Sequence, residues 1–155
     1  MNITEIYDFD GTICPHGHSR IPLAIKNLLD RQRKYTRMAI ASRRPKDSSF
    51  SRGIYDMLDM EGMRDWFFKI VIQDTSKREH INMIMEGSKE CCILYDDLKE
   101  NTDDCNNDAI CVLIEGKNGI EERHIKEGHS RILWSVVHTT PAMNMIRRKP
   151  KERFN

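Results

Sequence analysis

The sequence predicts an α/β protein, a single Rossmann-like three-layer sandwich built on a mostly parallel five-stranded sheet. Two observations lead to this class. Short apolar runs that are typical of buried strands alternate along the chain with segments of helical periodicity. The length of 155 residues suits one hydrophobic core and leaves little room for a second folded unit. Because parallel strands are joined by helical crossovers, the alternation predicts helices on both faces of the sheet.

The expected strands are short and apolar. They are residues 3–7, 37–41, a run that ends at Ile72, 91–95 and 110–114. Helical spacing lies between them, and the first helix is expected over residues 21–33. Its core positions are expected to be Leu23, Ile25, Leu28 and Leu29, and further helices are expected through Ile54 and Leu58, over 77–86 and over 103–107.

The helical and strand patterns weaken from Gly128 onward. Residues 132–137 are apolar, Pro141 follows, and the last residues of the chain are mostly charged. We therefore expect one domain over residues 1–140 and a basic, disordered tail over residues 141–155.

Polar residues follow the first four expected strands in a fixed order. The carboxyl ends of parallel strands open on one edge of the sheet, so residues far apart in the sequence meet there in one crevice. That edge is expected to carry Asp8 and Asp10 from the first strand, Ser42 from the second, Lys77 beyond the third, and Asp96 and Asp97 from the fourth.

This combination of acids, a hydroxyl and a lysine suits phosphoryl transfer to a carboxylate. An anionic nucleophile can approach an anionic phosphate only if a cation neutralises the charge. Mg²⁺ prefers oxygen ligands, which Asp8, Asp96 and a backbone carbonyl near Asp10 would supply together with the phosphate. The expected metal site is therefore Asp8, Asp10, Asp96 and Asp97.

Each residue in this set has an expected role. Asp8 would attack phosphorus and form an aspartyl phosphate, while Asp10 would protonate the leaving group and then activate water. Lys77 would pair with the nucleophile and the phosphate as a point charge. Gly11 would let the backbone turn out of the strand, so that both acids face the site.

The substrate is expected to contact Ser42, Arg43, Gly11 and Thr12. Ser42 would donate a hydrogen bond to a phosphate oxygen. Arg43 and Arg44 would hold an anionic part of the substrate, although solvated loop arginines are an equal alternative. Asp97 either assists the metal or caps the helix that begins near Leu98.

The ordered motifs resemble those of the haloacid dehalogenase superfamily: D-x-D-G-T at 8–12, a serine after the second strand, a lysine, and a pair of acids. The sequences Ala41-Ser42-Arg43 and Tyr95-Asp96-Asp97 are similar to those of its capless magnesium-dependent phosphatase branch. The resemblance implies a Mg²⁺-dependent phosphomonoesterase with no cap domain. Its open site would accept a phosphoprotein or a small phosphate ester.

Two other functions are compatible with the sequence. A nucleic-acid 3′-end phosphatase is suggested by the basic residues Arg31, Arg33, Lys34, Arg37, Arg147, Arg148, Lys149, Lys151 and Arg153. A non-catalytic, phosphate-dependent regulatory module would use Asp8 and Mg²⁺ as a switch. In response-regulator receivers, however, the phosphorylated aspartate follows a later strand, so the order here argues against this function.

The composition indicates the class of protein and the compartment in which we expect it. The charged fraction of 32% and the net charge of +1 indicate a globular chain with no overall attraction to polyanions. No apolar stretch approaches the length of a membrane span, and no leader is evident. We therefore expect a cytoplasmic protein without a membrane partner. The five cysteines favour reduced thiols. Cys14, His16 and His18 alternate as zinc ligands would, but no fourth ligand is evident.

Overall fold

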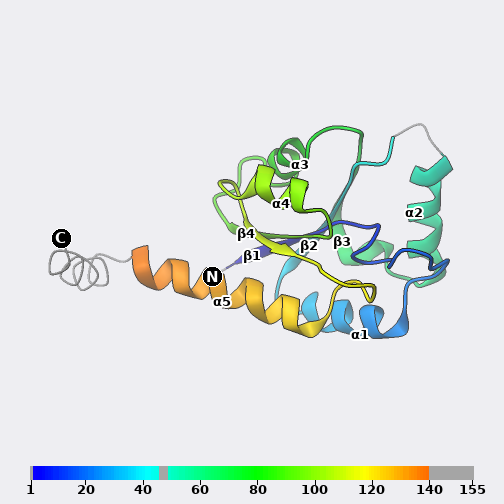
Figure 1. Ribbon diagram of the computed structural model, residues 1–155, viewed down its shortest axis with the longest axis horizontal. Coiled ribbons are helices and arrows are strands. Elements are labelled where there is room, and N and C mark those ends of the chain that lie inside the picture. Colours follow the sequence, from blue (N-terminus) through cyan, green and yellow to red (C-terminus); the bar gives the residue numbers. More distant parts are fainter. Residues whose placement is uncertain (1, 46–48, 140–155) are drawn as a thin grey trace, which may run out of the picture.

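The computed structural model describes residues 2–45 and 49–139, in which helices cover both faces of one sheet (Figure 1). The sheet has five strands in the order β3-β2-β1-β4-β5, and every neighbouring pair is parallel. The predicted Rossmann-like α/β class is confirmed. The strands are β1 (Ile3–Tyr7), β2 (Arg37–Ser42), β3 (Phe67–Ile72), β4 (Cys91–Asp96) and β5 (Ile110–Leu113).

The helices form two layers. In Figure 1, α1 and α5 lie on one side of the sheet, and α3 and α4 lie on the other. The helices are α1 (Leu23–Gln32), α2 (Ser49–Met60), α3 (Lys77–Ile84), α4 (Lys99–Cys105) and α5 (Glu122–Thr139), with a short 3₁₀ helix, η1 (Arg64–Trp66), before β3.

Successive residues of the central strand β1 pack into different layers. Tyr7 belongs to the larger apolar cluster, with Leu28 and Leu29 of α1. Ile6 belongs to the smaller cluster, with Ile81 and Ile84 of α3. Since consecutive side chains of a strand point to opposite faces, a strand covered on both sides must be apolar at nearly every position. This packing explains the continuous apolar runs in the sequence.

One predicted core position is wrong. Leu23 is 70% exposed, whereas Ile25, Leu28 and Leu29 are buried as expected. The helix begins at Leu23, directly after Pro22. Residues two positions apart in an α-helix are related by a rotation of about 200° about the helix axis. Leu23 and Ile25 therefore cannot share a face.

The end of the chain differs most from expectation. The weak pattern after Gly128 is in fact the long helix α5, which buries Ile125 and Ile132. A Cβ atom on Gly128 would lie 2.9 Å from Cγ2 of Ile93, so a glycine lets α5 approach the sheet closely. Glycine is a poor helix former, which weakened the helical pattern in the sequence.

Other expectations are shifted or lie outside the described part. The helix expected at 103–107 begins earlier, at Lys99. The predicted tail at 141–155 lies outside the described residues, so the boundary at residue 140 stays a prediction. Within ranges 2–45 and 49–139, no helix has the length and apolarity needed to cross a membrane.

Candidate active site

Residues from four strand ends meet around a cavity of about 350 Å³ at the carboxyl edge of the sheet. Most of the predicted site residues are there, as the topology requires. The cavity is lined by Asp8, Asp10, Ser42, Arg43, Lys77 and Asp97, together with His16, Arg44, Asp74, Leu98 and Asn101.

Two acids and one lysine form the buried part of the site. The Nζ atom of Lys77 lies 2.8 Å from Oδ1 of Asp8 and 3.2 Å from Oδ2 of Asp96, and it also donates to the backbone carbonyl of Ala41. Lys77 is 1% exposed and Asp96 is fully buried. Lys77 begins α3, so the loop after β3 delivers its ammonium group between the ends of β1 and β4.

This buried group holds more negative than positive charge, because two carboxylates share one ammonium. Burial raises the pKa of the Asp8 carboxyl well above its usual range, Lys77 opposes that rise, and Asp96 adds to it. A further cation near Asp8 would favour its ionised form. The site therefore has the electrostatic character of a cation site.

The local chain after β4 orients Asp96. Its Oδ1 accepts a hydrogen bond from the backbone N–H of Leu98 at 2.9 Å, and its Oδ2 accepts one from Nδ2 of Asn101 at 3.1 Å. Asn101 lies in the first turns of α4. The start of this helix thus fixes the carboxylate before any ligand arrives.

The acids also have the spacing that a metal needs. Asp8, Asp96 and Asp97 each offer a carboxylate oxygen, and these oxygens lie within 4.8 Å of one another. An all-oxygen set suits a hard cation such as Mg²⁺, so three of the four predicted ligands fit the group. The Asp10 side chain is not in this set, and a metal contact through a backbone carbonyl near Asp10 stays a prediction.

Gly11 and Asp97 are packed together at the rim. The φ angle of Gly11 is +81°, the left-handed conformation that the predicted turn requires. A Cβ atom there would overlap the Asp97 carboxylate and lie 2.6 Å from Nε2 of His16. His16 Nε2 donates to Oδ2 of Asp97 at 2.8 Å. Glycine at position 11 therefore makes room for the Asp97–His16 pair.

The predicted substrate-binding residues separate into two groups. Ser42 and Arg43 line the cavity, and Arg43 reaches Oδ1 of Asn101 at 3.3 Å. Thr12 is fully buried and does not line the cavity, so the described contacts give no support to its expected role. Gly11 shapes the rim through its backbone.

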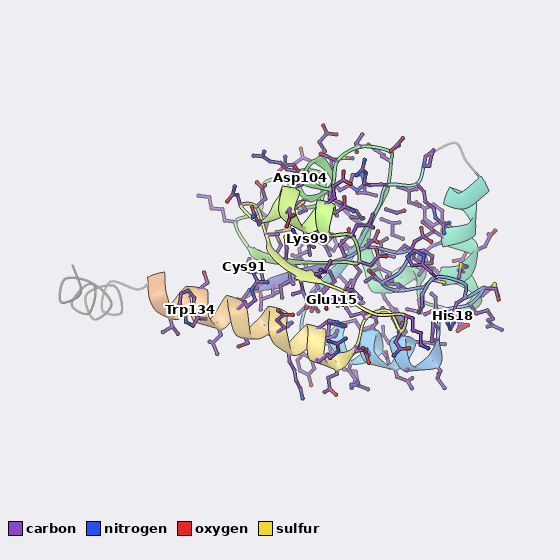
Figure 2. The ribbon with its side chains drawn as sticks, viewed as in Figure 1. His18, Cys91, Lys99, Asp104, Glu115 and Trp134 are labelled. Atoms are coloured by element: carbon purple, nitrogen blue, oxygen red, sulfur yellow. The ribbon has the colours of Figure 1, made fainter. Side chains whose placement is uncertain are left out.

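The alternative zinc site does not assemble. The Cys14 thiol is buried and lies 3.3 Å from the carbonyl oxygen of His18. His16 turns toward Asp97, whereas His18 lines a separate cavity of about 480 Å³ and extends at the outer edge of the molecule (Figure 2). Among the described residues, the metal-competent group is the three aspartates.

Two of the basic residues considered for nucleic acid, Arg33 and Arg37, pair with carboxylates that do not belong to the candidate site. Arg33 pairs with Asp30 at 2.7 Å, and Arg37 pairs with Glu90 at 3.1 Å. Arg37 begins β2 and so lies at the opposite edge of the sheet from Ser42. Contact with nucleic acid stays a prediction, and the basic residues from Arg147 onward are outside the described part.

Sequence reasoning gave no role to two cavity residues, Asp74 and Asn101. It considered His16 only as a zinc ligand and Arg44 only as a contact for an anionic part of the substrate. Asn101 had a usable indication, because it lies one helical turn beyond the acid pair. His16 had none, since 81 residues separate it from Asp97. Arg44 forms a two-point ion pair with Asp10 that local patterns do not encode.

No protein-family model matches the chain, and no curated protein matches it. The parallel sheet and its strand order are compatible with haloacid dehalogenase and other Rossmann-like folds. What is established is an acidic site at the carboxyl ends of the strands that could hold a metal.

Proposed function

We propose that this protein is a magnesium-dependent phosphomonoesterase of the haloacid dehalogenase type, working through an aspartyl phosphate on Asp8. The observation that carries the proposal is the buried arrangement in which Lys77 lies between Asp8 and Asp96, with Asp97 nearby. Bound Mg²⁺, held by these three aspartates and the carbonyl of Asp10, would neutralise phosphate charge.

The first step transfers the phosphoryl group to the protein. An oxygen of the Asp8 carboxylate attacks phosphorus while the bond from phosphorus to the ester oxygen breaks. Asp10 gives its proton to that oxygen, and the alcohol leaves. Lys77, fixed at 2.8 Å from Asp8, offsets the negative charge at the point of attack.

The second step restores the protein. The Asp10 carboxylate removes a proton from water, and the water oxygen attacks phosphorus as the bond to Asp8 breaks. Inorganic phosphate leaves, Asp8 is a carboxylate again and Asp10 is protonated again. Ser42, almost fully buried at the end of β2, would donate its hydroxyl proton to a phosphate oxygen.

The test is hydrolysis of an aryl phosphate by the full chain, with Mg²⁺ or with a chelator. Wild-type protein should release phosphate only with Mg²⁺, and acid-quenched samples should carry a phosphoryl group on the peptide containing Asp8. The Asp8→Asn variant, shown to be folded by circular dichroism, should do neither.

Two results would contradict the proposal. Undiminished turnover by Asp8→Asn would remove Asp8 as the nucleophile. A phosphorylated Asp8 that persists without release of phosphate would instead support the regulatory module.

A further inference from the structure

Arg44 closes the cavity on the side of Asp10. Its Nε atom lies 2.7 Å from Oδ2 of Asp10, and its Nη2 atom contacts Oδ1. Both carboxylate oxygens are therefore engaged by one planar guanidinium, a geometry that is stronger and more directional than a single contact. The Arg44 side chain is only 19% exposed, so it belongs to the cavity wall.

The surroundings of Arg44 hold it in this position. Its guanidinium lies over the ring of Phe9, 5.6 Å from the centroid, and Phe9 is fully buried. Its backbone N–H donates to Oγ of Ser42 at 3.3 Å. The neighbouring Arg43 has a different environment, because its side chain is 40% exposed and turns toward Asn101.

The ion pair conflicts with the role of Asp10 in catalysis. Asp10 must direct an oxygen at the leaving group, but Arg44 engages both of its oxygens. Arg44 must therefore change partner when substrate binds. A mostly buried guanidinium favours an anion in the geometry that Asp10 now occupies, so a substrate that supplies an anion compensates for the loss of Asp10. Carboxylate and phosphate are the groups whose geometry matches the guanidinium fork.

The order of residues along the cavity places that second anion. Lys77 contacts Asp8, which marks the position of the transferred phosphoryl group. Arg44 contacts Asp10, which marks the ester oxygen. A group that reaches Arg44 consequently belongs to the leaving alcohol and not to the transferred phosphate.

We propose, on the basis of the phosphatase function above, that Arg44 selects phosphate monoesters whose leaving alcohol carries a second anionic group, a carboxylate or a phosphate. Arg44 is then a specificity residue that exchanges Asp10 for this anion. The exchange releases Asp10 to face the ester oxygen.

Three matched esters test this selection with Mg²⁺ present: propyl phosphate, the same ester ending in a carboxylate, and propane-1,3-diyl bisphosphate. Wild-type kcat/KM should be about tenfold to a hundredfold higher for at least one anionic ester than for propyl phosphate, in line with a charge-assisted hydrogen bond. The better of the two identifies the anion. Arg44→Gln should abolish the preference, and Arg44→Lys should retain part of it.

Arg78→Gln is the matched control, because it removes an arginine that pairs with Asp108 and does not line the cavity, so it should preserve the ratio between the esters. Equal wild-type rates for all three esters would overturn the inference and leave the phosphatase function standing. A proportional loss on all three esters in Arg44→Gln would also overturn it. Failure of wild-type protein to hydrolyse any ester would contradict the phosphatase function itself. If Arg44→Gln does not fold, the wild-type ratios and Arg44→Lys decide.

Discussion

Two buried acids, Glu5 within strand β1 and Asp8 directly after it, lie three residues apart and have opposite surroundings. Glu5 is fully buried, yet its pKa is lowered: burial alone would raise it, but hydrogen bonds, led by the one from His129, more than compensate. The pKa of Asp8 is raised, chiefly by burial. Glu5 accepts from Gln32 Nε2 at 2.9 Å, Thr36 Oγ1 at 2.6 Å, Tyr95 Oη at 2.7 Å and His129 Nε2 at 3.1 Å.

The different surroundings of Glu5 and Asp8 indicate a structural role for Glu5 and a ligand-binding role for Asp8. The Glu5 carboxylate accepts hydrogen bonds from four donors, which lie in α1, the loop that follows it, β4 and α5. These bonds connect the helices α1 and α5 to the central strand. Asp8 has Lys77 as its counter-charge and shares it with Asp96. A buried acid that is already satisfied stabilises the fold, whereas one that lacks charge compensation can bind a ligand.

The largest expected effect compares the two acids directly. Asp8→Asn should lower kcat/KM toward an aryl phosphate on the order of 10⁴-fold, because it removes the nucleophile. Glu5→Gln, measured in the same assay with Mg²⁺, should keep kcat/KM within about threefold while it remains folded. A folded Glu5→Gln protein with no activity would contradict the assignment of a purely structural role to Glu5.

The second prediction concerns the lysine between the site acids. Lys77→Met should reduce the free energy of unfolding by about 3–5 kcal/mol in chelator, since it leaves two buried carboxylates without their counter-charge. Mg²⁺ should restore part of that loss, so the Mg²⁺-induced rise in urea midpoint should be larger in the variant than in wild type. An equal or smaller rise would argue against a cation at Asp8 and Asp96.

The third prediction concerns the pH dependence of stability that arises from His80. This residue is fully buried beside the site lysine, and Nδ1 of its ring has no hydrogen-bond partner among the described residues. Burial, with a smaller effect of Lys77, lowers its pKa from 6.5 to about 4. As pH falls from 6.5 to about 4, the unfolded chain binds a proton that the folded protein excludes, so stability falls.

The size of this loss is up to roughly 3 kcal/mol, from the free energy that corresponds to such a shift. Urea unfolding of wild type and His80→Gln across the same pH range measures it. The variant should show a shallower decline, and parallel curves would contradict the assignment to His80.

The smallest expected effect lies in the Glu5 network. Tyr95→Phe removes one of four donors and should cost about 1 kcal/mol, because the other three still satisfy the carboxylate. Its kcat/KM should equal that of wild type. A loss of activity as large as that of Asp8→Asn would mean that the two acids are not independent.

Much of the fold was predictable because it depends on local periodicity. A strand buried on both faces is apolar at nearly every position, and parallel order places the ends of strands at one edge. Leu23 and α5 were misjudged for local reasons: the exact start of α1 sets which face Leu23 occupies, and Gly128 weakens the helical pattern of α5. The tight packing that makes Gly128 useful is visible only in three dimensions.

The site was predictable where a residue follows directly from a strand. Ser42 and Asp96 end their strands and Asp8 directly follows β1, so the topology alone brings them together. The ion pair between Arg44 and Asp10 was not predictable, because it depends on side-chain conformation across loops 34 residues apart. The same applies to Glu5, whose partner His129 is 124 residues away.

The sequence by itself thus determined the α/β class, the order of the strand-end acids and the turn at Gly11, since each follows from periodicity or backbone chemistry. The sequence also predicted that Lys77 pairs with Asp8. Only the tertiary structure decided that Lys77 serves Asp96 as well and that Arg44 pairs with Asp10. Ion pairing depends on the reach and burial of side chains from separate elements, and residue spacing along the chain does not encode those distances.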